Sequence, residues 1–97
     1  MKAVFIVYNH GISEEVEDIL KKFEIKGFTR WLGVHGQGSN TGEPHLGTHI
    51  WPSVNAAMLT VINDEKVEPL LNEIEEVNKK VEEQGLHAFV FNVEKMV

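Results

Sequence analysis

Two segments of this chain carry apolar residues at helical spacing, and short apolar runs flank each of them. In the first segment the apolar positions recur at i, i+3, i+4 and i+7, at Val16, Ile19, Leu20 and Phe23. In the second they form a longer stripe at Val67, Leu70, Leu71, Ile74, Val77 and Val81. A helix with one apolar stripe buries that stripe against another layer of the protein. We therefore predict two amphipathic helices that pack on a sheet.

Residues at the ends of these segments indicate where the helices begin and end. Ser13 is predicted to be the N-cap of the first helix, with acidic residues in the turn that follows. Gly27 is predicted to close that helix, and Gly85 the second one. Pro69 is compatible with the second helix only because it lies close to the first turn.

The remaining apolar runs predict strands over residues 2–8, 28–35, 55–62 and 87–93. In the second of these, Arg30 and Trp31 fall on opposite faces, so that Arg30 can pair with a carboxylate while Trp31 packs within the protomer or against another subunit. The order strand–helix–strand–strand–helix–strand is that of the α+β, ferredoxin-like βαββαβ sandwich. We expect residues 1–97 to form a single domain, a four-stranded antiparallel sheet with two helices on one face.

The composition excludes several classes of function. The net charge is −6, with nine basic against fifteen acidic residues, so no basic stripe is available for a nucleic acid. The chain has no cysteine, which fits a cytoplasmic protein and rules out thiolate metal sites. Its first apolar run is too short for a signal sequence or a membrane span, so we expect no direct membrane insertion.

The predicted topology places all five histidines at one end of the sheet. In a βαββαβ fold the first and second strands run one way, and the third and fourth run the other. His10 follows the first strand and His87 opens the fourth, while His35, His45 and His49 lie between the second and third. One end of the domain is therefore predicted to differ chemically from the other.

The segment from His35 to Trp51 is the strongest candidate for the functional region. A long structureless segment inside a small domain is usually functional or disordered, and its aromatic and histidine content argues against plain disorder. Imidazole and carboxylate groups bind zinc, copper and nickel, so His35, His45, His49 and Glu43 are predicted metal ligands. The alternative is that these histidines are solvated or serve as hydrogen-bond anchors.

Other chemistries have weaker support. The glycines of GQGSNTG resemble a phosphate-binding loop only superficially, because no GxxxxGK[ST] pattern is present. Glu14 and Glu15 would repel a phosphate from the start of the first helix. No serine stands in a nucleophile elbow, so an enzyme would depend on histidine and Glu43 acid–base chemistry.

The passages KAVFIVYN, FTRWLGVHGQGS, NAAMLTVIND and QGLHAFVFNVE together resemble the PII-type nitrogen regulatory proteins over the whole chain. The segment GEPHLGTHIWPSVNA is similar to small PII-like proteins of poorly defined role. This resemblance implies a homotrimer with sheets packed inward and ligands bound between subunits. It also implies a partner-binding T-loop at about 36–54 and a nucleotide-binding B-loop at Gln84–His87, with Gly36, Gly38, Gly85 and His87 as candidate cofactor-binding residues.

The sequence departs from the family in its B-loop, where His87 is the only group able to become cationic, and in a C-terminal segment whose only basic residue is Lys95. A triphosphate there would lack charge-assisted hydrogen bonds. We therefore expect a PII-like signalling protein whose loop is ordered by a transition metal ion and then presented to a transporter or enzyme. The alternatives are an adenine-nucleotide-binding nitrogen regulator and a small trimeric enzyme that uses histidine acid–base chemistry.

Overall fold

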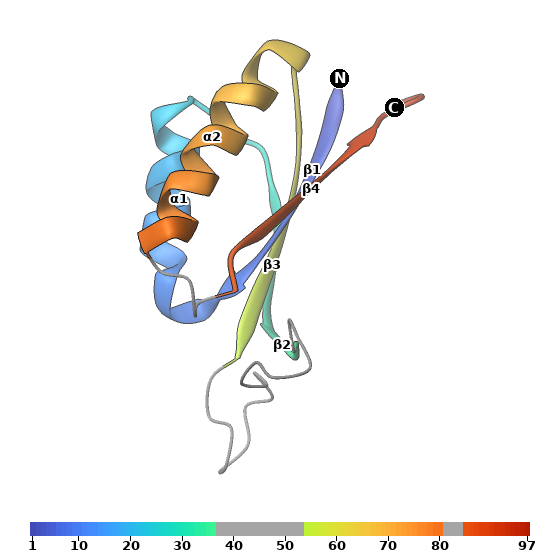
Figure 1. The fold of residues 1–97 in the computed structure, drawn as a ribbon. Coiled ribbons are helices and arrows are strands. Elements are labelled where there is room, and N and C mark those ends of the chain that lie inside the picture. The colour runs from blue at the N-terminus through green and yellow to red at the C-terminus, as the bar shows by residue number, and fades with distance from the viewer. Residues whose placement is uncertain (37–53, 81–84) are drawn as a thin grey trace.

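The structure is a computed structural model, and it describes residues 1–36, 54–80 and 85–97 (Figure 1). The elements follow the predicted order: β1 (Lys2–Asn9), α1 (Ser13–Lys22), β2 (Thr29–Val34), β3 (Asn55–Ile62), α2 (Asp64–Lys80) and β4 (His87–Asn92). A short 3-10 helix, η1 (His10–Ile12), joins β1 to α1. In the described part of the chain, no helix is both long and apolar enough to cross a membrane.

The strands form one antiparallel sheet in the order β2-β3-β1-β4. Both helices lie on the same side of this sheet (Figure 1). This arrangement confirms the predicted ferredoxin-like fold. It also confirms the strand directions on which the placement of the histidines depends.

Alternation along the strands divides the sheet into two faces. On β1, Val4, Ile6 and Tyr8 face the helices and are all at most 1% exposed. They pack in one core cluster with the apolar stripes of α1 and α2, which include Val16, Ile19, Leu20, Val67, Leu70 and Ile74. The periodic positions of the sequence therefore form the core, as predicted.

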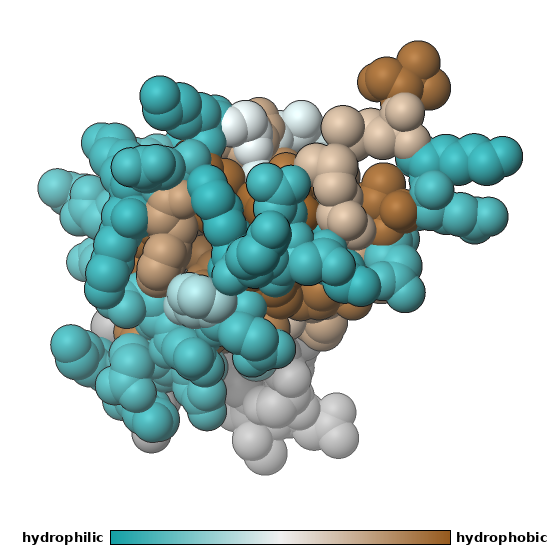
Figure 2. Space-filling view, turned by 90° about the horizontal axis from the view of Figure 1, so that it is seen from above, coloured by the Kyte–Doolittle hydropathy of each residue, from teal (hydrophilic) through white to brown (hydrophobic). Residues whose placement is uncertain are grey.

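The opposite face of the sheet, which we call the open face, is apolar and has no layer over it among the described residues. Phe5 of β1 lies between Leu59 of β3 and Phe89 of β4 in the strand register. The Phe5 ring contacts Trp31 of β2 edge-on, with ring centroids 6.4 Å apart. Trp31, Phe89 and Phe91 remain 45%, 51% and 57% exposed. Figure 2 shows hydrophilic side chains over the helices and hydrophobic side chains gathered over the strands and the C-terminal end.

The beginning of α1 differs from the prediction. Asn9, not Ser13, provides the side-chain cap, because its Oδ1 accepts a 2.7 Å hydrogen bond from the Gly11 backbone N–H at the start of η1. Ser13 is already helical, and its Oγ donates to the His10 carbonyl at 2.7 Å. Strand β1 thus passes into helix one turn earlier than the capping pattern indicated.

The end of α1 also differs. The helix ends at Lys22, and the residue with positive φ is Glu24 (57°), not Gly27. The chain must turn back early because Ile25, which is 7% exposed, returns to the core. Its backbone N–H donates to the Leu20 carbonyl at 2.9 Å. Gly27 lies beyond this turn, where its carbonyl accepts a hydrogen bond from the buried Thr60 hydroxyl at 2.6 Å.

The second helix agrees with the prediction as far as it is described. Pro69 lies inside α2, and the stripe residues Val67, Leu70 and Ile74 are buried. Val81 and the segment before Gly85 lie outside the described residues, so the predicted end of this helix stays a prediction.

Candidate functional site

One end of the sheet gathers the segments that the sequence singled out. We call it the loop pole and define it by Asn9, His10, Val34–Gly36, Val54, Asn55 and Gly85–His87. The His10 backbone N–H donates to the Val54 carbonyl at 3.0 Å. Strand pairing places Val34 opposite Asn55, and Val7 opposite His87. Both ends of the long segment between β2 and β3 therefore lie at the same end of the sheet as the end of β1 and the start of β4, with β2 and β4 on opposite edges.

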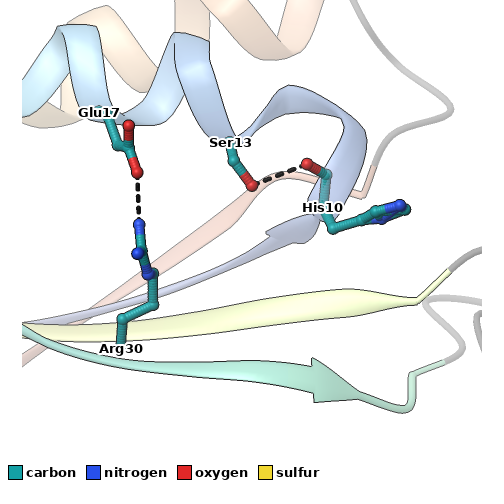
Figure 3. Close-up of polar contacts among 4 residues, drawn as sticks. All are labelled: His10, Ser13, Glu17 and Arg30. Atoms are coloured by element: carbon teal, nitrogen blue, oxygen red, sulfur yellow. Dashed lines mark hydrogen bonds and ion pairs between the residues drawn. The ribbon is translucent and has the colours of Figure 1, made fainter.

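The described histidines lie at this pole, as the topology predicted, but they do not form a cluster. His10, His35 and His87 are all exposed. The His10 imidazole points away from the neighbouring Ser13 and Glu17 side chains (Figure 3). No group of three potential metal-ligating side chains comes together within residues 1–36, 54–80 and 85–97.

Most of the predicted metal ligands lie in the undescribed part of the chain. Glu43, His45 and His49, together with the candidate cofactor residue Gly38, fall outside the described residues. His35 stands directly after β2, at the point where this segment begins. The metal site therefore remains a prediction.

Gly36 occupies a position that no larger residue fits without rearrangement. A Cβ built there would lie 2.5 Å from Nδ2 of Asn55, a residue only 7% exposed. A Cβ atom essentially never comes this close to a non-bonded atom, so a side chain at Gly36 would displace the Asn55 side chain. Gly36 therefore leaves room for the buried Asn55 side chain where the long segment begins.

Two further glycines direct the chain at or near the loop pole. Gly33 has a φ of +68° and lies where the pairing of β2 with β3 shifts register between Trp31 and Val34. Such a bulge turns the strand and re-aims the residues after it. Gly85, with a φ of +61°, precedes the buried Leu86 and the exposed His87. Left-handed backbone favours glycine at both positions.

Beneath α1, next to the loop pole, lies a polar group of which sequence reasoning anticipated only the arginine and a carboxylate partner. Arg30 of β2 forms an ion pair with Glu17 of α1, as the predicted pairing of Arg30 with a carboxylate allowed (Figure 3). Tyr8 lies below this layer at 0% exposure. The Ser13 hydroxyl and the Arg30 guanidinium lie near its phenol, although neither forms a hydrogen bond of regular geometry with it. Burial raises the pKa of the Tyr8 phenol, and the positive charge of Arg30 opposes that rise. The available signal was a lone tyrosine on the helix-facing positions of a buried strand.

Comparison with known proteins identifies the family. The family model for nitrogen regulatory protein P-II matches residues 1–97. The chain belongs to the P-II family. A search of curated proteins found no match.

Solved structures with the same fold include PII-like proteins from two organisms. The nitrogen regulatory PII-like protein CPII from Thiomonas intermedia K12, bound to ADP and bicarbonate, superposes with a TM-score of 0.76 at 22% identity, over 95% of this chain and 84% of that one. A putative PII-like signalling protein from Thermus thermophilus gives a TM-score of 0.68 at 21% identity, over 95% and 85%. The apo form of CPII gives 0.64 at 17% identity, over 95% and 89%. The P-II family thus places this chain among regulatory signalling proteins.

Proposed function

We propose that this protein is a PII-like regulator in which a small ligand, bound at the loop pole, changes how the segment between β2 and β3 is presented to a partner protein. The observation that carries the proposal is the geometry of the pole. Val54, at one end of that segment, bonds to His10, and Gly36, at the other end, lies against Asn55. His87 pairs with Val7 at the same end of the sheet, on the edge opposite β2. A ligand held there can act on both ends of the segment at once.

A homotrimer formed through the open face is the second part of the proposal. Trp31, Phe89 and Phe91 leave large aromatic surfaces on the side of the sheet that the helices do not cover. Contiguous apolar patches of this kind mark interaction sites. Packing three sheets inward would bury them and would place the edges of neighbouring subunits, including β4 and His87, next to each other.

An adenine nucleotide is the ligand that the comparisons favour. CPII has been solved with ADP, AMP and bicarbonate. The resemblance to the family implies that Gln84–His87 corresponds to its nucleotide-binding B-loop. Gly36, Gly38, Gly85 and His87 are the residues we assign to it. The loop pole as defined contains imidazoles but no lysine or arginine among its described residues, so we expect the less charged AMP to bind better than ATP.

A transition metal ion is the second candidate, favoured by the histidines at the pole. His35 would act with His45, His49 and Glu43 to bind zinc, copper or nickel and order the segment. Imidazole and carboxylate groups form such sites without thiolates. The proposed regulated partner, a transporter or an enzyme, is the same for both ligands.

Thermal unfolding with each ligand tests the proposal, because a ligand specific for the native state raises its stability. One series compares AMP, ADP and ATP, each with and without bicarbonate. A separate series tests zinc, copper and nickel without nucleotide. Sedimentation measures the oligomer in the same samples. We expect stabilisation by AMP that exceeds that by ATP, and a trimer.

Three matched histidine variants separate the two ligands. His87→Ala should abolish the nucleotide response and leave a metal response, while His35→Ala should do the opposite. His10→Ala, the third described imidazole of the loop pole, is the control and should change neither. No stabilisation by any nucleotide or metal would contradict the proposal, and conversion of a nucleotide to products would favour the enzyme alternative.

A further inference from the structure

A hollow of about 170 Å³ lies at the end of the sheet away from the loop pole, where the N-terminus is also found (Figure 1). The pairing of β2 with β3 begins only at Thr29 and Leu59, so the turn before β2 is not held against the last residues of β3. Gly27 leaves this space open, because a Cβ built there would meet no described atom within 4 Å. We call it the distal hollow and define it by residues 24–27, residues 61–63, Met1 and Lys66.

Charged side chains of both signs line the distal hollow. Glu24 provides a carboxylate, and Lys26 and Lys66 provide ammonium groups. Among the described residues, none of these three side chains takes part in an ion pair. The Nζ of Lys66 donates instead to the Glu24 carbonyl at 3.4 Å, while the N-terminal ammonium group of Met1 is already paired with Asp64 at 3.0 Å. The hollow therefore keeps one negative and two positive side chains that do not neutralise each other.

The buried part of the distal hollow is apolar. Ile25 and Ile62 line it and are 7% and 5% exposed. Both side chains belong to the core cluster, which holds them in place. An apolar surface with a few polar groups around it is the usual lining of a small-molecule site.

The backbone of Glu24 holds its carboxylate beside the hollow at a conformational cost. Glu24 has a φ of 57°, a left-handed conformation that favours glycine, especially after the end of a helix. Its N–H donates to the Lys21 carbonyl at 3.0 Å, and this hydrogen bond holds the turn. Strained residues of this kind gather at ligand-binding sites. Glutamate at a position where glycine would be unstrained points to a use for its carboxylate.

We propose that the distal hollow binds a small α-amino acid, such as alanine or serine, in its zwitterionic form. Lys26 and Lys66 bind the carboxylate through charge-assisted hydrogen bonds, and Glu24 binds the ammonium group. The side chain of the ligand lies against Ile25 and Ile62. At roughly 30 Å³ for each water molecule, the hollow has the volume of about six waters, which suits an amino acid of this size.

The mixture of charges selects a zwitterion over a simple ion. A simple anion at the two lysines would face the Glu24 carboxylate, and a simple cation at Glu24 would face the two lysines. An amino acid carries both signs a short distance apart, so each of its charges meets the opposite one. None of these residues belongs to the loop pole, so the inference does not depend on the function proposed above.

Titration of the intact protein with L-alanine tests the inference. The backbone amide resonances of Lys26 and Gly27 report binding by NMR, and thermal unfolding reports stabilisation. Propionate and ethylamine are the matched controls, because the first is alanine without its ammonium group and the second is alanine without its carboxylate. We expect alanine to shift both resonances and to bind at least about tenfold more tightly than either control, since each control lacks one charge-assisted pair. No shift, or equally tight binding of a control, would overturn the proposal.

Variants assign the binding to these side chains. Glu24→Gln should abolish the preference for alanine over propionate, and Lys66→Gln should weaken the binding of both. Glu24→Gly should also abolish the preference, but without lowering the free energy of unfolding, because glycine adopts a φ of 57° without strain. This variant separates a lost ligand contact from a damaged fold. Lys21→Gln removes a positive charge of α1 outside the hollow and should change neither affinity. A preference for alanine that survives in both Glu24 variants would overturn the assignment.

Discussion

The helix-covered face and the open face of the sheet are built from the same four strands, yet the chain completes only one of them. On the covered face Ile6, Met58 and Leu70 are at most 1% exposed. On the open face the aromatic side chains of β2 and β4 remain about half exposed. The first face therefore stabilises the monomer, and the second is available to stabilise an assembly.

Removal of a side chain from the covered face should have the largest effect. Leu70→Ala leaves a cavity at a position that is 0% exposed and should cost about 2–5 kcal/mol in the free energy of unfolding. Denaturant titration at a fixed protein concentration measures this. Leu32→Ala, at a position 68% exposed, is the control and should cost less than about 0.5 kcal/mol. Similar losses of unfolding free energy in Leu70→Ala and Leu32→Ala would contradict the difference in burial between these positions.

Removal of a side chain from the open face should affect association more than folding. Phe91→Ala should cost the monomer less than about 1 kcal/mol, since the ring is 57% exposed, but should weaken the proposed trimer. Sedimentation equilibrium checks the association. Phe23→Ala, which removes a ring packed against the core on the helix side, should lower stability without changing the oligomer. A trimer that survives in Phe91→Ala would argue for a different interface.

Tyr8 is the polar exception on the covered face, and its effect should depend on pH. Because burial raises the pKa of Tyr8 in the folded protein above 10.0, the unfolded chain loses this proton first, and stability falls as the pH rises through that range. Tyr8→Phe should remove this fall. At neutral pH the substitution should change stability by less than about 1 kcal/mol, because the hydroxyl forms no hydrogen bond of regular geometry with the described residues. The free energy of unfolding is measured at neutral and alkaline pH for the unmodified protein and for Tyr8→Phe. An equal decrease with pH in both would contradict the assignment.

The smallest effect is expected at the end of the sheet away from the loop pole. The N-terminal ammonium group lies 3.0 Å from Oδ1 of Asp64 and lowers the pKa of that carboxyl below 3.8, through a hydrogen bond and its charge. Stability from this pair is present above pH 3.8 and is lost as the pH falls through the lowered pKa. Asp64→Asn should slightly reduce the loss of stability as the pH falls. High salt should have the same effect on the unmodified protein. A larger change than in Leu70→Ala would be inconsistent with an exposed pair.

The periodic parts of the chain could be predicted closely, and the connections less well. The strand over 55–62 matches β3 residue by residue, and the stripe of α2 is buried where it was expected. The two ends of α1 were wrong. Ser13 and Gly27 have the usual residue types for helix ends, but the buried Ile25 and the Asn9 cap decided where the helix begins and ends. Packing outweighs capping preference when the two compete.

The candidate site was predictable to the extent that topology fixes it. The strand directions placed His10, His35 and His87 at one pole, and the structure confirms this for all three. The restriction at Gly36 could not be foreseen, because it depends on the position of Asn55 across a strand pair. The position of the buried Tyr8 hydroxyl near Arg30 depends in the same way on strand register.

The sequence by itself determined the elements, their order and the residues that each helix buries, because these follow from periods of two and 3.6 residues within a single segment. Only the tertiary structure decided that Tyr8, Glu17 and Arg30, from three different elements, meet beneath α1. It also decided that the aromatic rings of β2 and β4 stay uncovered. Both outcomes depend on strand register and on how the layers pack, which join positions far apart in the chain and leave no periodic pattern in the sequence.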